Sequence, residues 1–157
     1  MSIAPIETPL TTEMLFQPPQ RLLRVEDLES FPAELPSCPV DYELDSGRLV
    51  FSMVPPVFLH GDAQSNIVTE LKNQGGRKGH GKAATDTGVV LRRNPDTVLS
   101  PDVLFVAKKS LPVRTSREGY LETIPELVVE IRGKNDSPKY IDRKIGQYLA
   151  AGVEIVW

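Results

Sequence analysis

Cysteine is almost absent from this sequence, since Cys38 is the only one among 157 residues. A lone cysteine cannot form an internal disulfide, so we expect the chain in a reducing compartment, the cytoplasm. The sequence has no apolar run near the ~20 residues that span a bilayer. It also lacks a basic segment followed by an apolar one at its start, so we expect no secretion signal and no membrane partner. Hydrophobic residues at 40% and charged residues at 25% are typical of one globular domain.

Several enzyme motifs are missing as well. There is no HExxH segment, no histidine pair four residues apart and no cysteine cluster, so a zinc site is not expected. A GxSxG segment, which would indicate a serine nucleophile, does not occur. Neither a P-loop nor a GxGxxG segment is present. Any chemistry must therefore come from other groups.

Proline is unevenly distributed, and this suggests where the regular fold begins. Seven of the 14 prolines precede residue 40. Because proline interrupts helices and sheet ladders, residues 1–39 are predicted to form an irregular arm with one short helix at 25–31. Residues 40–157 are predicted to form the domain itself.

The pattern from residue 40 onward predicts a mixed sheet with two helices. Asp45-Ser46-Gly47 is typical of a hairpin turn. Ser137-Pro138 and Gly152 are typical of the start and end of a helix. In the C-terminal part of the chain, a strand, a helix and a second strand follow one another. This order implies that the two strands pair in parallel and are joined by a right-handed crossover. The predicted strands are 40–44, 48–53, 83–91, 98–106, 127–131 and one within 152–157, and the predicted helices are 59–72 and 138–151.

Two carboxylates stand in or beside apolar strands, where an unpaired charge costs free energy. Glu130 lies inside the run LVVEI, and alternation places it on the face opposite Leu127 and Val129. Asp102 follows Pro101 at the start of the run VLFV. Glu130 could instead pair with Arg132 at a sheet edge, and Asp102 could be a turn residue.

Three further residues are candidates for a site. Lys144 lies on the flank of the apolar stripe of the last helix, where a lysine could also snorkel to solvent. His60, at the start of the first long helix, could instead be a hydrogen-bonded core residue. Glu43, in the hairpin, could simply face solvent.

Together these residue types suggest metal-assisted chemistry. Two carboxylates on neighbouring strands can hold a hard divalent cation, and Mg²⁺ (or Mn²⁺) suits one or two carboxylates with water and phosphate oxygens. Such a metal activates water and neutralises phosphodiester charge, and a nearby lysine stabilises the charge that develops. The alternative is a structural protein in which Glu130 and Lys144 form a buried ion pair.

Charge is also distributed unevenly along the chain. The net charge is −3, but residues 1–60 hold three basic and nine acidic residues, whereas residues 61–157 hold fifteen basic and twelve acidic residues. The basic stretch at Arg92 and Arg93 is a candidate for holding phosphates of a nucleic acid. A solvated surface is the alternative.

The order of these segments resembles the Uma2 family. The similarity extends from about residue 40 to 157. It rests on the segments Tyr42–Val50, His60-Gly61 after two prolines, Pro101–Val106, Leu127–Ile131, and the tail formed by Lys144, Tyr148, Ala151–Val153 and Trp157.

The resemblance implies the PD-(D/E)xK, restriction-endonuclease-like fold, with a mixed central sheet flanked by helices. It implies a metal-dependent endonuclease that hydrolyses DNA, with Asp102 and Glu130 as ligands of Mg²⁺ or Mn²⁺. Arg132 stands where the family pattern has its lysine, and because arginine stays protonated it is a poor base. The resemblance then assigns the lysine's role to Lys144 and a phosphate contact to Arg132.

Further implications concern the rest of the site and the assembly. His60 and Glu43 match other motif positions and would complete the site. A homodimer is implied by analogy, since a duplex has two strands to cut. The alternative is a non-catalytic nuclease-fold protein with a binding or regulatory role.

Overall fold

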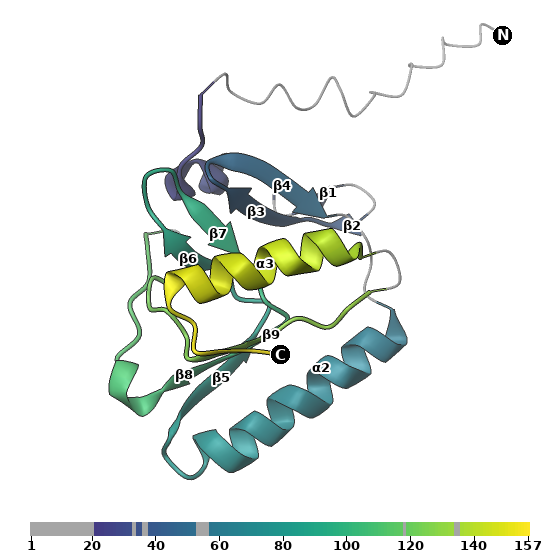
Figure 1. Ribbon diagram of the computed structural model, residues 1–157, viewed down its shortest axis with the longest axis vertical. Helices are drawn as coiled ribbons and strands as arrows, with labels where there is room; N and C mark the ends of the chain where they lie inside the picture. Colours follow the sequence, from purple (N-terminus) through teal and green to yellow (C-terminus); the bar gives the residue numbers. More distant parts are fainter. Residues whose placement is uncertain (1–20, 33, 36–37, 53–56, 118, 134–135) are drawn as a thin grey trace, which may run out of the picture.

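The computed structural model describes residues 21–32, 34–35, 38–52, 57–117, 119–133 and 136–157 (Figure 1). Its helices are α2 (Phe58–Leu71) and α3 (Pro138–Ala151), with shorter helical segments η1 (Val25–Ser30), η2 (Lys72–Gly76) and η3 (Lys108–Ser110). Its strands are β1 (Glu34–Leu35), β2 (Cys38–Pro39), β3 (Asp41–Asp45), β4 (Arg48–Ser52), β5 (Gly81–Thr85), β6 (Val89–Arg92), β7 (Thr97–Leu99), β8 (Val103–Ala107), β9 (Leu127–Val129) and β10 (Ile155–Val156). Neither long helix among these residues is long and apolar enough to cross a bilayer.

The strands form two four-stranded sheets, in the orders β10-β9-β8-β5 and β4-β3-β7-β6, beside the short β1-β2 pair. The predicted mixed α/β class is confirmed. The predicted strands 83–91 and 98–106, however, are each broken in two. Asp86 adopts a positive φ of 46°, which ends β5, and Pro101 cannot donate a ladder hydrogen bond between β7 and β8. The chain therefore passes from one sheet to the other at residues 86–88 and again at 100–102.

The last third of the chain follows the predicted pattern. The Ser137 side chain caps α3 by accepting from Tyr140 N, Pro138 takes the first position, and Gly152 ends the helix at φ 102°. Strand β10 then pairs in parallel with β9. The strand–helix–strand return is confirmed, and it fixes α3 against the sheet that contains β8 and β9.

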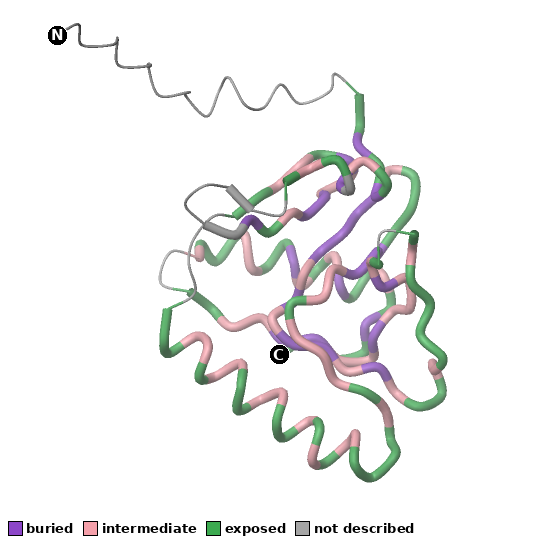
Figure 2. Tube along the Cα trace, turned by 180° about the vertical axis from the view of Figure 1, so that it is seen from behind, coloured by how far each residue is buried: buried purple, intermediate pink, exposed green. Residues whose placement is uncertain are grey.

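The two long helices cover opposite faces of that sheet. Tyr148 of α3 packs in one core with Leu104 and Val128, and α3 crosses in front of the strands in Figure 1. Alternation turns Phe105 to the other face, where its ring lies against Gly75 just after α2. No residue of α2 is buried, and Figure 2 shows the helix half-exposed along its length. The deeper packing is therefore on the α3 side.

Part of the predicted arm belongs to the packed structure. Leu23, Val25 and Leu28 are buried in a second core with Leu44 and Val98. Segment η1, a 3₁₀-helix, lies where the sequence predicts a short helix. Residues 1–20 lie outside the described residues, so the predicted domain boundary at residue 40 stays a prediction.

Candidate active site

Strand register places three carboxylates at one end of the β10-β9-β8-β5 sheet. Val103 of β8 pairs with Thr85 of β5 on one side and with Val129 of β9 on the other. Just beyond these paired residues lie Asp86 after β5, Asp102 before β8 and Glu130 after β9. Because both pairings are antiparallel, these three residues continue the same row across the sheet. The predicted convergence of Asp102 and Glu130 thus follows from backbone geometry.

Lys144 bridges two of the predicted acids. Its Nζ lies 2.7 Å from Oε1 of Glu130 and 3.1 Å from Oε1 of Glu43. The lysine is only 4% exposed, and the two carboxylate side chains are nearly as buried. Helix α3 therefore presents this ammonium to the sheets and not to solvent, and the snorkelling alternative does not hold.

Other donors hold the two glutamates in place. Tyr148, fully buried on α3, donates its hydroxyl to Oε1 of Glu130 at 2.6 Å. Glu43 accepts from the backbone N–H of Ser100 at 3.0 Å and from the Tyr140 hydroxyl at 3.3 Å. Both carboxylates are thus fixed by several elements, as a buried charge requires.

Asp102 is held by α2 and by the strand end. Its Oδ1 lies 3.0 Å from Nε2 of His60, and its Oδ2 accepts from the backbone N–H of Ile131. One turn after His60, the Gln64 side chain donates to the Asp102 carbonyl and to Oδ1 of Asp86, both at 2.8 Å. The start of α2 therefore fixes the segment that contains the first predicted ligand.

The Lys144 ammonium is stabilised in its charged form. Burial alone would lower the pKa of Lys144, but the neighbouring carboxylates of Glu43 and Glu130 outweigh burial and raise it above its usual value. At neutral pH this lysine is a fixed positive charge. It is suited to hold and neutralise anions and not to remove a proton.

The carboxylates, in turn, share an excess of negative charge. Burial raises the pKa of Glu130; the Lys144 and Tyr148 contacts oppose this, and the Asp102 charge adds to it. Desolvation, followed by the charges of Asp86, Glu43 and Asp102, raises the pKa of Asp41. A bound cation would relieve this repulsion.

The donor set fits a hard cation. Among the described residues, no group of three or more His, Cys, Asp or Glu side chains is arranged to hold a metal ion. Mg²⁺ is nevertheless commonly bound by only one or two protein carboxylates, and water and phosphate oxygens supply its other ligands. Asp102 and Glu130 lie at adjacent strand ends and can supply these two carboxylates. Oε2 of Glu130 has no hydrogen bond to any described residue, since only Oε1 is engaged. Asp102 and Glu130 are the residues that would hold such an ion.

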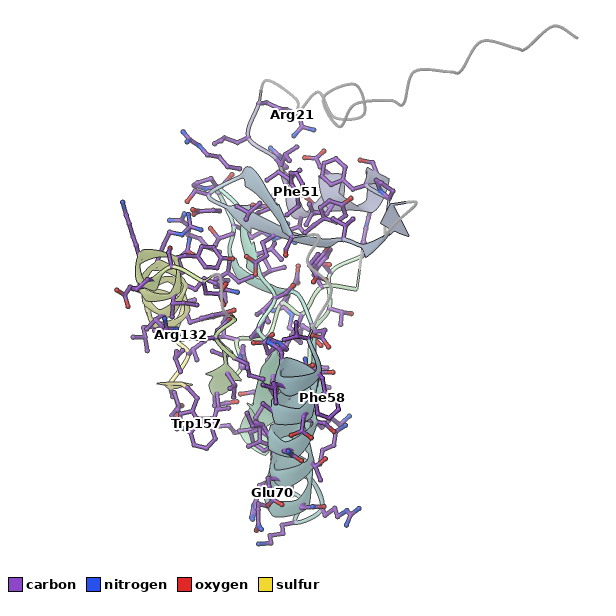
Figure 3. All side chains as sticks on the ribbon, turned by 90° about the vertical axis from the view of Figure 1, so that its right-hand side faces the viewer. Arg21, Phe51, Phe58, Glu70, Arg132 and Trp157 are labelled. Atoms are coloured by element: carbon purple, nitrogen blue, oxygen red, sulfur yellow. The ribbon has the colours of Figure 1, made fainter. Side chains whose placement is uncertain are left out.

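The predicted arginines do not join this cluster. Arg132 is exposed, and among the described residues Glu130 pairs with Lys144 instead of with Arg132. Figure 3 shows Arg132 on the side of the molecule that carries α3. Arg92 donates to Ser46 Oγ at 2.9 Å. Arg93 is paired with three carboxylates, those of Glu26, Asp96 and Glu122. The sequence neighbours Arg92 and Arg93 are therefore engaged in other contacts, and phosphate binding by them stays a prediction.

Several participating residues were missed in the sequence analysis. Tyr148 was named only in the family-like tail and was given no role, although a buried tyrosine hydroxyl usually finds a hydrogen-bond partner. Gln64 follows His60 by four residues, which places both on one helix face, and that spacing was the available signal. Asp86 gave no signal, because its role depends on a strand break that the sequence pattern did not predict.

Tyr148→Phe tests how tightly Glu130 is held. The change removes one donor from a buried carboxylate, so we expect a loss of about 2 kcal/mol in the free energy of unfolding. Tyr140→Phe is the matched control, because its hydroxyl contact is longer and the residue is partly exposed; its loss should stay below about 1 kcal/mol. Urea denaturation measures both. Equal losses would contradict the geometry given for Glu130.

The mixed α/β fold is consistent with the class of restriction-endonuclease-like proteins. A model of the Uma2 family, described as "Putative restriction endonuclease", matches residues 25–157, so the chain belongs to the Uma2 family. Among solved structures it is similar to a crystal structure of a "putative nuclease belonging to DUF820" from Anabaena variabilis. That match has a TM-score of 0.64 and 18% identity, and it covers 84% of this chain and 70% of the other. The predicted restriction-endonuclease-like fold is thereby confirmed. None of the curated proteins matches the chain.

Proposed function

We propose that this protein is a metal-dependent endonuclease that hydrolyses DNA phosphodiester bonds. The observation that supports this most directly is the meeting of Asp102, Glu130 and the Lys144 ammonium at one end of one sheet. Two carboxylates that can hold a divalent ion, with a fixed positive charge beside them, suit metal-assisted phosphodiester hydrolysis. Membership of the Uma2 family, whose description is "Putative restriction endonuclease", supports the same conclusion.

Asp102 and Glu130 would hold Mg²⁺ or Mn²⁺. Bound there, the ion would supply Lewis-acid stabilisation of a phosphodiester and a lowered pKa for its water. The protein's own task is then positional. His60 and Ile131 N–H fix the two oxygens of Asp102, while Tyr148 fixes Oε1 of Glu130 and leaves Oε2 available.

Lys144 would act as a fixed charge in this site. Its ammonium has three N–H donors, and two of its neighbours are the carboxylates of Glu43 and Glu130. The raised pKa favours a role in holding water or stabilising the charge that develops on phosphate, and it disfavours a general-base role. Glu43 would orient the ammonium from the other sheet without touching the substrate.

Plasmid cleavage tests the proposal. We expect the purified protein to convert supercoiled DNA to nicked or linear product with Mg²⁺ or Mn²⁺, and to lose this activity in excess EDTA. Glu130→Gln, which removes the charge but keeps the shape, should abolish cleavage while the folded state persists in circular dichroism. Cleavage that continues in EDTA, or that survives Glu130→Gln, would overturn the metal assignment. A folded protein that cleaves under none of these conditions would favour a non-catalytic binding role.

A further inference from the structure

Positive charge gathers at the end of the β10-β9-β8-β5 sheet opposite the carboxylate cluster. Two segments meet there, residues 71–84 from the end of α2 into β5, and residues 104–110 from β8 through η3. They contain six basic residues and no acidic one. All six are exposed, and among the described residues only Lys109 forms ion pairs, with Glu126 and Glu154. The other five form what we call the basic patch: Lys72, Arg77, Lys78, Lys82 and Lys108.

The backbone that carries the basic patch is fixed to the sheet. The backbone N–H of Lys108 donates to the His80 carbonyl at 2.7 Å, and that of His80 donates to the Gly75 carbonyl at 2.9 Å. The Phe105 ring packs on both Gly75 and Gly81, where an added Cβ would come within 2.6 Å of the ring. Because the main chain is already ordered, less conformational freedom is lost when the patch meets an anionic partner. Figure 1 shows this turn between α2 and β5 at the end of the molecule remote from η1.

The carboxylate cluster, by contrast, repels a polyanion. The Lys144 ammonium is shared between Glu43 and Glu130, and Asp86 and Asp102 add further negative charge nearby. The chain as a whole carries a net charge of −3. A bound divalent ion would offset the charge of the cluster without leaving an excess of positive charge there. A nucleic acid must therefore gain much of its affinity from cations elsewhere on the surface.

Strands β5 and β8 set the distance between the basic patch and the cluster. Lys82 and Asp86 are four residues apart along β5 and its end, which is about 13 Å at the rise of a strand. Asp102 and Lys108 are six residues apart along β8, which is about 20 Å on the same measure. A DNA duplex advances about 3.4 Å per base step, so these lengths correspond to about four to six steps.

We propose that the basic patch binds the phosphate backbone of a DNA duplex about four to six steps from the bond to be cut; this rests on the proposed endonuclease function. The five cations are spread over η2, β5 and η3, and an extended polyanion can contact all of them. Among the described residues, none of the exposed large hydrophobic side chains lies in either segment, whereas a membrane-binding surface carries such side chains beside its cations. Contacts to phosphates position a duplex without reading its sequence.

Duplex binding in EDTA tests this without requiring cleavage. Fluorescence anisotropy of a labelled DNA duplex is followed between about 50 and 200 mM salt. The triple variant Arg77→Gln, Lys78→Gln and Lys82→Gln should bind at least about tenfold more weakly than wild type at the lowest salt. The slope of log K against log salt should also fall by about 2–3, because each lost phosphate contact releases fewer counterions.

A matched variant controls for the change in net charge. Arg48, Arg114 and Arg117 are exposed and lie outside the basic patch. Replacing all three with Gln should weaken duplex binding by less than about threefold, because salt screens charges remote from the contact. Circular dichroism should show both triple variants folded as wild type is, since all six side chains are exposed.

The remaining outcomes decide between partners. Equal weakening in the two triple variants, or no binding of the duplex by wild type, would overturn the proposal. Binding to phosphatidylserine vesicles that depends on the basic patch, with no such dependence for the duplex, would overturn it in favour of a membrane surface. Patch-dependent duplex binding without plasmid cleavage would uphold the patch and count against the proposed catalysis alone.

Discussion

Asp102→Asn is expected to reduce metal-dependent cleavage by at least about 10²–10³-fold, the loss typical for removal of one charge-stabilising group. Asn keeps an oxygen that can accept from Ile131 N–H and preserves the side-chain shape, so the fold should persist. It removes the negative charge that would hold the cation, and it replaces the carboxylate that faces His60. Initial rates of plasmid nicking at fixed Mg²⁺ measure the effect.

A matched control separates this effect from a general change of charge. Asp142 is exposed on α3, about 200° around the helix from the buried Lys144, so Asp142→Asn should leave the rate unchanged. A metal titration adds a second readout, because a lost ligand shifts the Mg²⁺ requirement upward. An Asp102→Asn rate within tenfold of wild type, at the same Mg²⁺ requirement, would contradict the assignment of Asp102.

Lys144→Met is expected to destabilise the protein by about 3–5 kcal/mol. Methionine fills a similar volume but leaves the carboxylates of Glu43 and Glu130 buried without their shared cation. Breaking a buried ion pair from one side costs this much because the remaining charge is uncompensated. Urea denaturation at pH 7 measures the loss of unfolding free energy.

The size of this loss depends on the remaining carboxylates, which gives a sharper test. Adding Glu43→Gln and Glu130→Gln to Lys144→Met should recover part of the stability, since no buried charge is then left alone. Lys139→Met, an exposed lysine on the same helix, should change stability by no more than about 0.5 kcal/mol. A loss below about 1 kcal/mol for Lys144→Met would show that the lysine is not the buried cation described here.

Local signals in the sequence were enough to predict α3 and its surroundings. Ser137, Pro138 and Gly152 act within one helical turn of the helix ends, so their effect does not depend on the rest of the fold. Alternation in LVVEI likewise gave the face of Glu130, because the two-residue period of a strand is a local property. The convergence of Asp102 with Glu130 was predicted through the family resemblance and agrees with the register of β8 and β9.

Local sequence signals could not predict contacts between residues that lie far apart along the chain. Lys144 was placed on the flank of a stripe, but its burial depends on Glu43, which lies 101 residues away along the chain. The position of Asp86 in the site depends on the break between β5 and β6, and continuous strand patterns gave no sign of that break. Adjacency in sequence likewise gave no indication that Arg93 pairs with three carboxylates, those of Glu26, Asp96 and Glu122.

Calorimetric titration with Mn²⁺ tests the central claim most directly, because it needs neither substrate nor cleavage. The claim is that Asp102 and Glu130 together hold one hard cation beside the Lys144 ammonium. We predict one Mn²⁺ bound per chain by the wild-type protein and by Asp142→Asn, with affinity reduced at least tenfold in both Asp102→Asn and Glu130→Gln. Unchanged Mn²⁺ binding in both site variants, with the fold intact, would contradict the account.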